Sequence, residues 1–234
     1  YWPDWCAIDP GVKSDLYSSA MLKRGNWLFD LIFPPFFKKI RFEIADEAEL
    51  TRAGREGTIV YVTRGLGQLE YNYFAHLFKE VGLPPSAFAN DISFRRWMQW
   101  KEYKATLITQ IERMEKDGGI PNPVSSGWLT ELVISGQSAL LSLRGTELED
   151  ESILLSYSQK LLRAVIAAHK KGSRPVFLVP LEFVWDRRPS HATRSVIDIL
   201  FGEKENPGRI RKIVLFWRNY GHRAVAKVGE PIDL

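Results

Sequence analysis

The chain has 234 residues, of which 45% are hydrophobic and 26% are charged, as in globular proteins with a substantial buried core. This length is enough for one large domain or two small ones. The net charge of +4 suits an anionic partner, but it is too small to choose among phosphates, nucleic acid and a membrane surface. The single cysteine, Cys6, excludes an internal disulfide and a cysteine-ligated metal cluster.

Residues 1–35 are rich in turn residues and predict an irregular N-terminal segment. The first residue is not an initiator methionine, so we expect the chain to be part of a longer protein. The run WLFDLIFPPFFKKIRF at 27–42 combines large apolar groups with Lys38, Lys39 and Arg41. Three interpretations remain open, because such a run can lie on an anionic membrane surface, contact a partner, or pack on the domain core. No apolar run is long enough to span a bilayer.

The rest of the chain alternates between strand and helix patterns. Buried strands are predicted at 58–62, 128–134, 175–184, 210–217 and 222–228. Helices are predicted at 68–81, 94–117, 151–171 and 192–202. Pro180 lies inside a predicted strand, which indicates a bulge or a sheet edge. The alternation predicts a single α/β domain with a mixed, largely parallel central sheet flanked by helices.

The four histidines give no clear catalytic or metal-binding set. His76 and Glu80 are four residues apart and share a predicted helix face, but no third metal ligand accompanies them. We therefore interpret His76 as a packing residue. No Gly-x-Ser-x-Gly elbow, dinucleotide fingerprint or P-loop occurs, and neither a metal nor a cofactor is expected. A Ser-His-Asp triad stays open, because its members need not be close in sequence.

The stretch VTRGLGQLEY at 62–71 connects a predicted strand to a predicted helix. Loops at the carboxyl ends of parallel strands are the usual ligand region of such sheets. This turn nevertheless contains no His, Cys, Ser, Asp or Lys. It therefore has the position of an active site without the residues that usually carry the chemistry.

Several blocks of the sequence have patterns of their own: TIVYV (58–62), GLPPSAFAND (82–91), Phe94-Arg95-Arg96, RPVFLVPLEFVWD (174–186) and RNYGHRAVAKVGEPIDL (218–234). In this order and spacing they resemble the bacterial glycerol-3-phosphate acyltransferase family. The family has a matching strand before a His-Arg-Ser-His-Met-Asp-Tyr turn, a Gly-Leu-Val-Pro-Pro segment, an arginine block, an Arg-Pro strand and a Gly-Glu-Pro-Ile ending. The resemblance covers most of residues 36–234 and implies an acyltransferase-like domain there.

The family's His-x4-Asp pair uses the histidine as a general base on a glycerol hydroxyl and the aspartate to orient the imidazole. The resemblance places Gly65 at the histidine position and Glu70 at the aspartate position. A glycine cannot accept a proton, so the base is missing. Arg95 and Arg96 are the remnants of a phosphate site, and we expect Arg64 to lie at the same strand end.

A further family block reads Glu-Gly-Gly-Arg-Ser-Arg, and its Glu and Arg help to hold the phosphate substrate. Counted without gaps from the predicted strand at 128–134, this block falls on residues 135–140. Ser135, Gly136 and Ser138 then occupy its positions as the expected substrate-binding residues, while its Glu and Arg are absent. Scaffold residues are retained and functional residues are replaced, which favours a pseudoenzyme.

The sequence thus favours a glycerol-3-phosphate acyltransferase-like protein related to phospholipid biosynthesis, catalytically degenerate, that binds a lipid, an acyl group or a protein. One alternative is an active acyltransferase that uses Glu70 or His76 as a relocated base and takes its acyl chain from acyl-CoA or acyl-carrier protein. Another is a structural subunit of a larger assembly, with some of its eight tryptophans at an interface. The expected partners are therefore an acyl donor, a glycerolipid, a membrane surface or a protein, and not nucleic acid. The expected location is the cytoplasm, including the inner face of the membrane.

Overall fold

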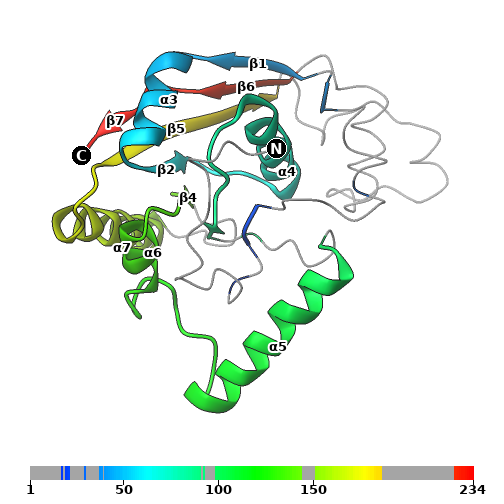
Figure 1. Cartoon of the computed structure of the whole chain (residues 1–234), viewed down its shortest axis with the longest axis vertical. Coiled ribbons are helices and arrows are strands. Elements are labelled where there is room, and N and C mark those ends of the chain that lie inside the picture. The colour runs from blue at the N-terminus through cyan, green and yellow to red at the C-terminus, as the bar shows by residue number, and fades with distance from the viewer. Residues whose placement is uncertain are drawn as a thin grey trace.

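The computed structural model describes residues 17, 19–21, 29, 37–38, 40–90, 92, 98–143, 151–185 and 224–234. Within these residues a seven-stranded sheet has the order β1-β6-β5-β2-β4-β3, and β7 also pairs with β5 (Figure 1). The predicted helix at 192–202 and the predicted strand at 210–217 lie outside the described residues, as do Arg95 and Arg96.

The parallel part of the sheet consists of β2 (Thr58–Thr63), β3 (Phe88–Ala89), β4 (Ala139–Ser142) and β5 (Val176–Trp185). β2 pairs in parallel with both β4 and β5, and β3 pairs in parallel with β4. The remaining strands are β1 (Arg41–Ile44), β6 (Ala224–Val228) and β7 (Ile232–Asp233). β1 is parallel to β6, whereas β6 and β7 are antiparallel to β5. The prediction of an α/β fold with a mixed, largely parallel sheet is confirmed.

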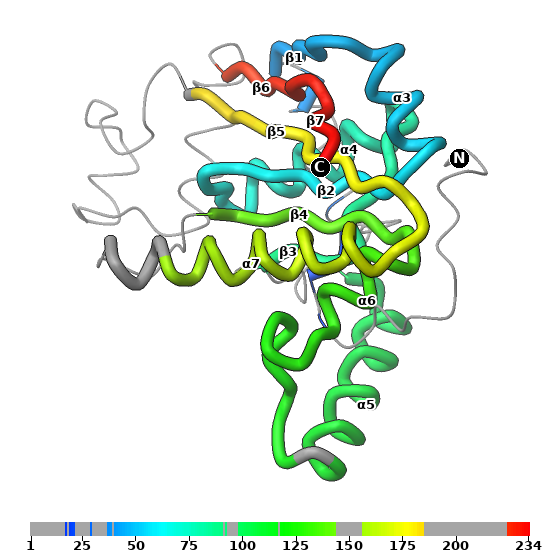
Figure 2. Tube along the Cα trace, turned by 90° about the vertical axis from the view of Figure 1, so that its left-hand side faces the viewer, coloured from blue at the N-terminus to red at the C-terminus, as the bar shows by residue number. Residues whose placement is uncertain are grey.

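Helices cover both faces of this sheet (Figure 2). The described helices are α3 (Glu47–Glu56), α4 (Gln68–Val81), α5 (Trp100–Asp117), α6 (Trp128–Ile134) and α7 (Glu151–Lys171). Successive side chains of a strand point to opposite faces. Accordingly Ile59 and Tyr61 pack in the core with α3 and α4, while Val60 packs in a second core with α6 and α7. The two buried layers fix β2 from both sides.

Several predicted elements are confirmed almost residue for residue. The strand at 58–62 extends to Thr63, and the helices at 68–81 and 151–171 have the predicted limits. Gly82 ends α4 in the left-handed conformation, with φ 73°, which suits a residue without a Cβ atom. The helix predicted from residue 94 begins at Trp100 within the described residues, because Gln99 is extended and forms its N-cap.

The strand predicted at 128–134 is wrong, since these residues form α6. Leu129, Leu132 and Val133 are buried at helical spacing against α7, and the Thr130 hydroxyl donates to the Ala164 carbonyl at 3.2 Å. The strand follows instead at Ala139–Ser142. Seven apolar residues are too few for periodicity to separate a buried helix from a buried strand, so packing against α7 decides the outcome.

The expectation of a bulge or sheet edge at Pro180 is met only in part, because no bulge occurs but one side of β5 has no strand partner there. β5 is an internal strand, and Pro180 lies opposite Val62 in an unbroken register with β2. On its other side β5 pairs with β7 through Leu178 and with β6 from Leu181 onward. Pro180 lies in the break between these two ladders, and its carbonyl accepts from the Gly229 N–H at 2.9 Å. A missing N–H is tolerated there because neither β6 nor β7 pairs with β5 at Pro180.

The described residues of the aromatic N-terminal part pack on the domain. Met21, Phe29, Phe37 and Ile40 are buried in the core that contains α4. Tyr17 packs in the second core, and its hydroxyl donates to the Pro121 carbonyl at 2.7 Å. For these residues the core-packing interpretation accounts for the apolar side chains. No helix among the described residues is long and apolar enough to cross a membrane.

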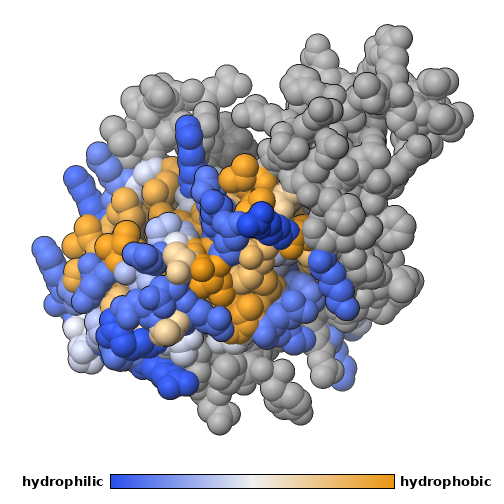
Figure 3. Space-filling view, turned by 90° about the horizontal axis from the view of Figure 1, so that it is seen from above, coloured by the Kyte–Doolittle hydropathy of each residue, from blue (hydrophilic) through white to orange (hydrophobic). Residues whose placement is uncertain are grey.

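The edge strand β1 is charged on its exposed side. Arg41 pairs with Glu43 at 3.1 Å, and Lys227 on β6 pairs with the same carboxylate at 3.4 Å. Charged side chains on an edge strand oppose pairing with another sheet. The face seen from above, where β1 and α3 are uppermost, carries hydrophilic side chains around smaller apolar areas (Figure 3).

Candidate functional site

The carboxyl ends of β2, β3 and β4 meet at one edge of the sheet because these strands are parallel. There Thr63 lies opposite Ser142, and the Leu143 N–H donates to the Thr63 carbonyl at 2.9 Å. Asn90 follows β3, and its buried amide donates to the Ser142 carbonyl and accepts from the Ser142 N–H, both at 2.8 Å. Backbone pairing and one side chain therefore hold the floor of the candidate site.

The turn above this floor carries the chain from β2 into α4. Arg64, Gly65 and Gly67 are exposed, whereas Leu66 is buried in the main core and anchors the turn. Among the described glycines, left-handed backbone occurs at Gly82, Gly118, Gly127 and Gly136. Gly65 is not one of these, so its backbone conformation does not require a glycine.

Glu70 lies in the first turn of α4, whose N-cap is Gly67. Its carboxylate folds back so closely that a Cβ atom added at Gly67 would overlap the Glu70 Oε2 atom. The amino end of a helix carries unpaired N–H groups and a partial positive charge, both of which favour a carboxylate. The position of Glu70 is therefore that of a group that stabilises the start of α4.

Tyr71, which follows Glu70, belongs to the scaffold rather than to an open site. The side chain is fully buried, and its hydroxyl donates to the Ser19 carbonyl at 2.8 Å. Burial raises the pKa of Tyr71 well above its ordinary value. The phenol thus stays neutral and joins the N-terminal part of the chain to α4.

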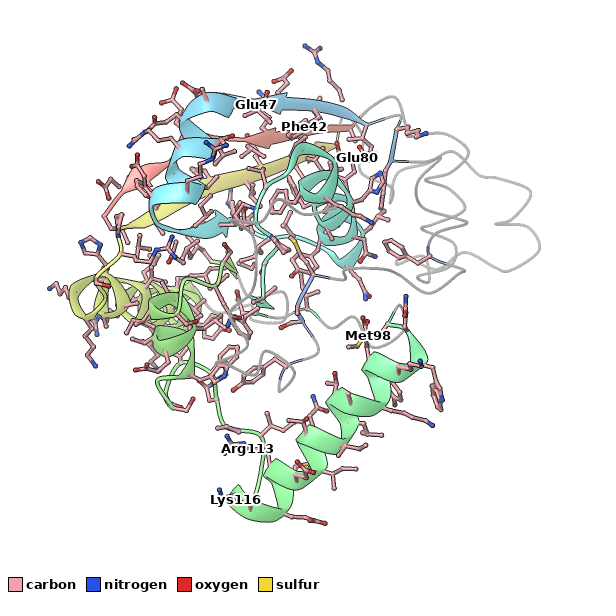
Figure 4. All side chains as sticks on the ribbon, in the orientation of Figure 1. Phe42, Glu47, Glu80, Met98, Arg113 and Lys116 are labelled. Carbon is pink, nitrogen blue, oxygen red and sulfur yellow. The ribbon has the colours of Figure 1, made fainter. Side chains whose placement is uncertain are left out.

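His76 lies on α4 but not at the strand end. It follows Glu70 by six residues, which is about 9 Å along a helix axis. Its Nε2 atom is 3.2 Å from the Glu80 carboxylate, and its ring packs 5.5 Å from the ring of Phe37 (Glu80 is labelled in Figure 4). The packing interpretation of His76 agrees with this geometry. Among the described residues no group of three potential ligands could hold a metal ion.

Ser135, Gly136 and Ser138 lie at the opposite edge of the sheet. They precede β4, whose length of roughly 13 Å separates them from the edge that holds Arg64. The guanidinium of Arg174 lies over Gly136, 3.0 Å from the position of an added Cβ atom. The structure therefore brings Arg64, Gly65 and Glu70 together but not the three residues before β4.

Comparison with known proteins gives one family match. A family model described as the glycerol-3-phosphate acyltransferase PlsB N-terminal domain matches residues 31–234. The chain belongs to this family. No curated protein and no solved structure matches. The chain is accordingly a glycerol-3-phosphate acyltransferase-related protein, which connects it to phospholipid biosynthesis.

The helix at 128–134 changes how the residues before β4 are understood. The ungapped count that placed a family block on 135–140 began from 128–134, which is a helix. A block that follows a strand would begin after Ser142, where residues 144–150 lie outside the described residues. Sequence reasoning also missed Asn90, whose signal was its position at the end of the GLPPSAFAND block.

Proposed function

We propose that this domain is a catalytically degenerate acyltransferase-like module that binds a glycerolipid or its acyl group. The observation that carries the proposal is Gly65, exposed at the end of β2, where the resemblance expects the proton-accepting histidine. The hydrogen bonds between Asn90 and Ser142 hold the strand ends below this turn, which supports a retained ligand region in this proposal. Binding rather than acyl transfer is then the function that such a site supports best.

The competing proposal, an active enzyme with a relocated base, needs His76 or Glu70 to reach a substrate hydroxyl. His76 is held by Glu80 and Phe37 farther along α4, which removes it from the strand end. Glu70 lies at the strand end, but its carboxylate is turned against Gly67 at the start of the helix. A general base must come within hydrogen-bond reach of the proton that it removes.

The test is an acyl-transfer assay on the purified chain, with acyl-CoA and acyl-carrier protein as donors and glycerol 3-phosphate as acceptor. We expect no turnover above background for the wild type, and we expect titration calorimetry to detect binding of a lysophosphatidic acid. Glu80→Ala, an exposed carboxylate on the same helix, is the matched control for Glu70→Ala. Turnover that Glu70→Ala abolishes and Glu80→Ala leaves unchanged would contradict the proposal.

A second variant asks whether only the base is missing. Gly65→His restores a His-x4-Glu pair at a backbone that does not require glycine. If the remaining site is intact, this variant should show turnover that the wild type lacks. Absence of lysophosphatidic acid binding by both the wild type and Gly65→His would overturn the proposal of a retained ligand site.

A further inference from the structure

Helix α5 projects from the domain as an arm, together with the segment that returns to α6 (Figures 1 and 2). Its amino end adjoins Met98, and Arg113 and Lys116 lie toward the outer end (Figure 4). On one side of the arm, Thr106 and Gln110 are buried. The side next to it is exposed at positions 100, 104, 107, 111 and 114.

This solvent-facing side carries a row of large apolar residues. The exposed fractions are 68% for Trp100, 40% for Leu107, 46% for Ile111 and 54% for Met114. Single exposed apolar residues are ordinary on protein surfaces, but a contiguous row on one helix indicates a binding surface. Together with Lys104, these residues are spaced by four, three, four and three positions. That spacing is the repeat by which two helices pack side by side.

Lys104 fits such a seam despite its charge. Its ammonium lies 5.1 Å from the centre of the Trp100 ring, so its aliphatic stem runs along the apolar row. Trp100 also stacks on Tyr103 with ring centres 5.7 Å apart, which holds the indole at the end of the helix. These two contacts orient the indole of Trp100 at the amino end of the row.

We propose that α5 forms an antiparallel pair with α5 of a second copy of this chain. A two-fold axis near the middle of the helix sets Leu107 against Ile111 of the partner subunit, and the reverse contact follows from the symmetry. The same register sets Trp100 against Gly118 of the partner subunit, so the largest side chain of the row meets a residue without one. Gly118 ends α5 in the left-handed conformation and has no heavy atom near its Cβ position.

Charges beside the seam are complementary in this register. Lys101 lies next to Glu115 of the partner subunit, and the symmetry repeats this pair at the other end. Ile108, which is 55% exposed, lies beside its own symmetry mate near the axis. A parallel pair would instead place Lys104 on Lys104 of the partner subunit within the seam. The antiparallel pair also sets the two domains at opposite ends, because each arm meets its domain at the amino end of α5.

The first experiment is sedimentation velocity of the whole chain over a range of concentrations, without lipid. One helix pair is smaller than a standard interface of about 1,600 Å², so we expect dimers at about tens of micromolar protein. The double change Leu107→Asp with Ile111→Asp should weaken dimerisation at least about tenfold, since it places four carboxylates in the seam. Ile166→Asp, an exposed isoleucine on α7, is the control and should leave it unchanged. A chain that stays monomeric at all concentrations would overturn the proposal.

The second experiment tests the register. Lys101→Glu alone and Glu115→Lys alone should each weaken dimerisation about tenfold at low salt, because two attractive pairs become repulsive. The variant with both changes should restore dimerisation. Binding of any other partner to this face would not predict such a restoration. Binding of the monomer to anionic vesicles, lost with Leu107→Asp and Ile111→Asp and not restored by the exchanged charges, would replace the second copy with a lipid surface.

A third measurement uses cross-linking in a Cys6→Ala background. Ile108→Cys should give covalent dimers with a short bismaleimide, because residue 108 of one subunit and residue 108 of the other lie on either side of the proposed two-fold axis. Glu112→Cys, one turn along and outside the apolar row, should not. Equal cross-linking at both positions would overturn the antiparallel register.

Discussion

Glycine lies at both edges of the parallel sheet around β2, Gly57 at the amino edge and Gly65 at the carboxyl edge, but the structure constrains only the first. At the amino edge, a Cβ atom added to Gly57 would overlap the Pro175 carbonyl oxygen and the Phe177 ring. At the carboxyl edge, Gly65 is exposed and has no left-handed backbone. Packing dictates the first glycine, whereas neither packing in the core nor backbone conformation dictates the second.

The difference shows which parts of the fold are constrained by structure. The amino edge is closed by direct contacts, since the Thr58 hydroxyl donates to the Val133 carbonyl at 3.2 Å and the Arg174 guanidinium to the Arg55 carbonyl at 3.3 Å. The carboxyl edge has a rigid floor below an exposed turn. A substitution in that exposed turn should therefore change the free energy of unfolding little.

The largest effect should come from Gly57→Ala. The new methyl group meets a backbone oxygen and an aromatic ring, so we expect a loss of about 2–3 kcal/mol in the free energy of unfolding. Gly65→Ala is the matched control and should change this free energy by less than about 0.5 kcal/mol. Urea unfolding followed by tryptophan fluorescence measures both. Equal losses for the two variants would remove the contrast between the edges.

A somewhat smaller effect is expected at the floor of the carboxyl edge. Asn90→Ala leaves the buried N–H and carbonyl of Ser142 without the side chain that pairs with them, at a cost of about 2 kcal/mol. Asn122→Ala also removes two hydrogen bonds, to the N–H groups of Val124 and Ser125, but these are exposed. Its cost should be about 0.5 kcal/mol. If the two asparagines proved equivalent, the floor would be no more rigid than a surface loop.

The strand, helix and turn that form the carboxyl edge could be predicted because their sequence signals are local. The residues at 59–62 are continuously apolar and a turn follows Thr63, while the 14 residues of α4 are followed by the C-cap Gly82. The segment at 128–134 could not be assigned in this way, because its apolar residues fit both periods and only contact with α7 decides between them. Long, periodic elements can be predicted from the sequence, whereas the secondary structure of short buried segments depends on the elements that pack against them.

The same reason explains where the proposed site residues lie in the fold. Gly65 and Glu70 follow a strand that was assigned correctly, so their place in the turn was predicted correctly. Ser135 and Gly136 were counted from a segment that is a helix and not a strand, and they lie at the opposite edge from Gly65 and Glu70. Asn90 was missed because its role depends on pairing with a distant strand, and no local pattern encodes that pairing.

A third prediction concerns alkaline pH at the buried side of the turn. Burial raises the pKa of Tyr71 above its ordinary value of 10 and raises the pKa of Tyr73 to about 12. Below pH 10 both phenols are neutral in the folded and unfolded states, so their full contribution to the free energy of unfolding is present. As the pH rises above 10 the unfolded chain loses protons first, and stability should fall by up to about 1.4 kcal/mol per pH unit for each tyrosine. Tyr71→Phe should make this fall shallower, and an unchanged slope would contradict the assigned cause.

The smallest effect separates two roles for Glu70. If its carboxylate serves the start of α4, Glu70→Ala should lower the free energy of unfolding by about 0.5–1 kcal/mol, since a helix amino end favours a negative charge. Glu70→Gln keeps an oxygen that can accept from the first N–H groups, so it should recover part of the loss. If the Glu70 carboxylate served only catalysis, neither variant would lose free energy of unfolding. Urea unfolding measures these changes, with the exposed Glu80→Ala as the control. A loss of stability in Glu70→Ala but not in Glu80→Ala would mean that the Glu70 carboxylate stabilises the start of α4.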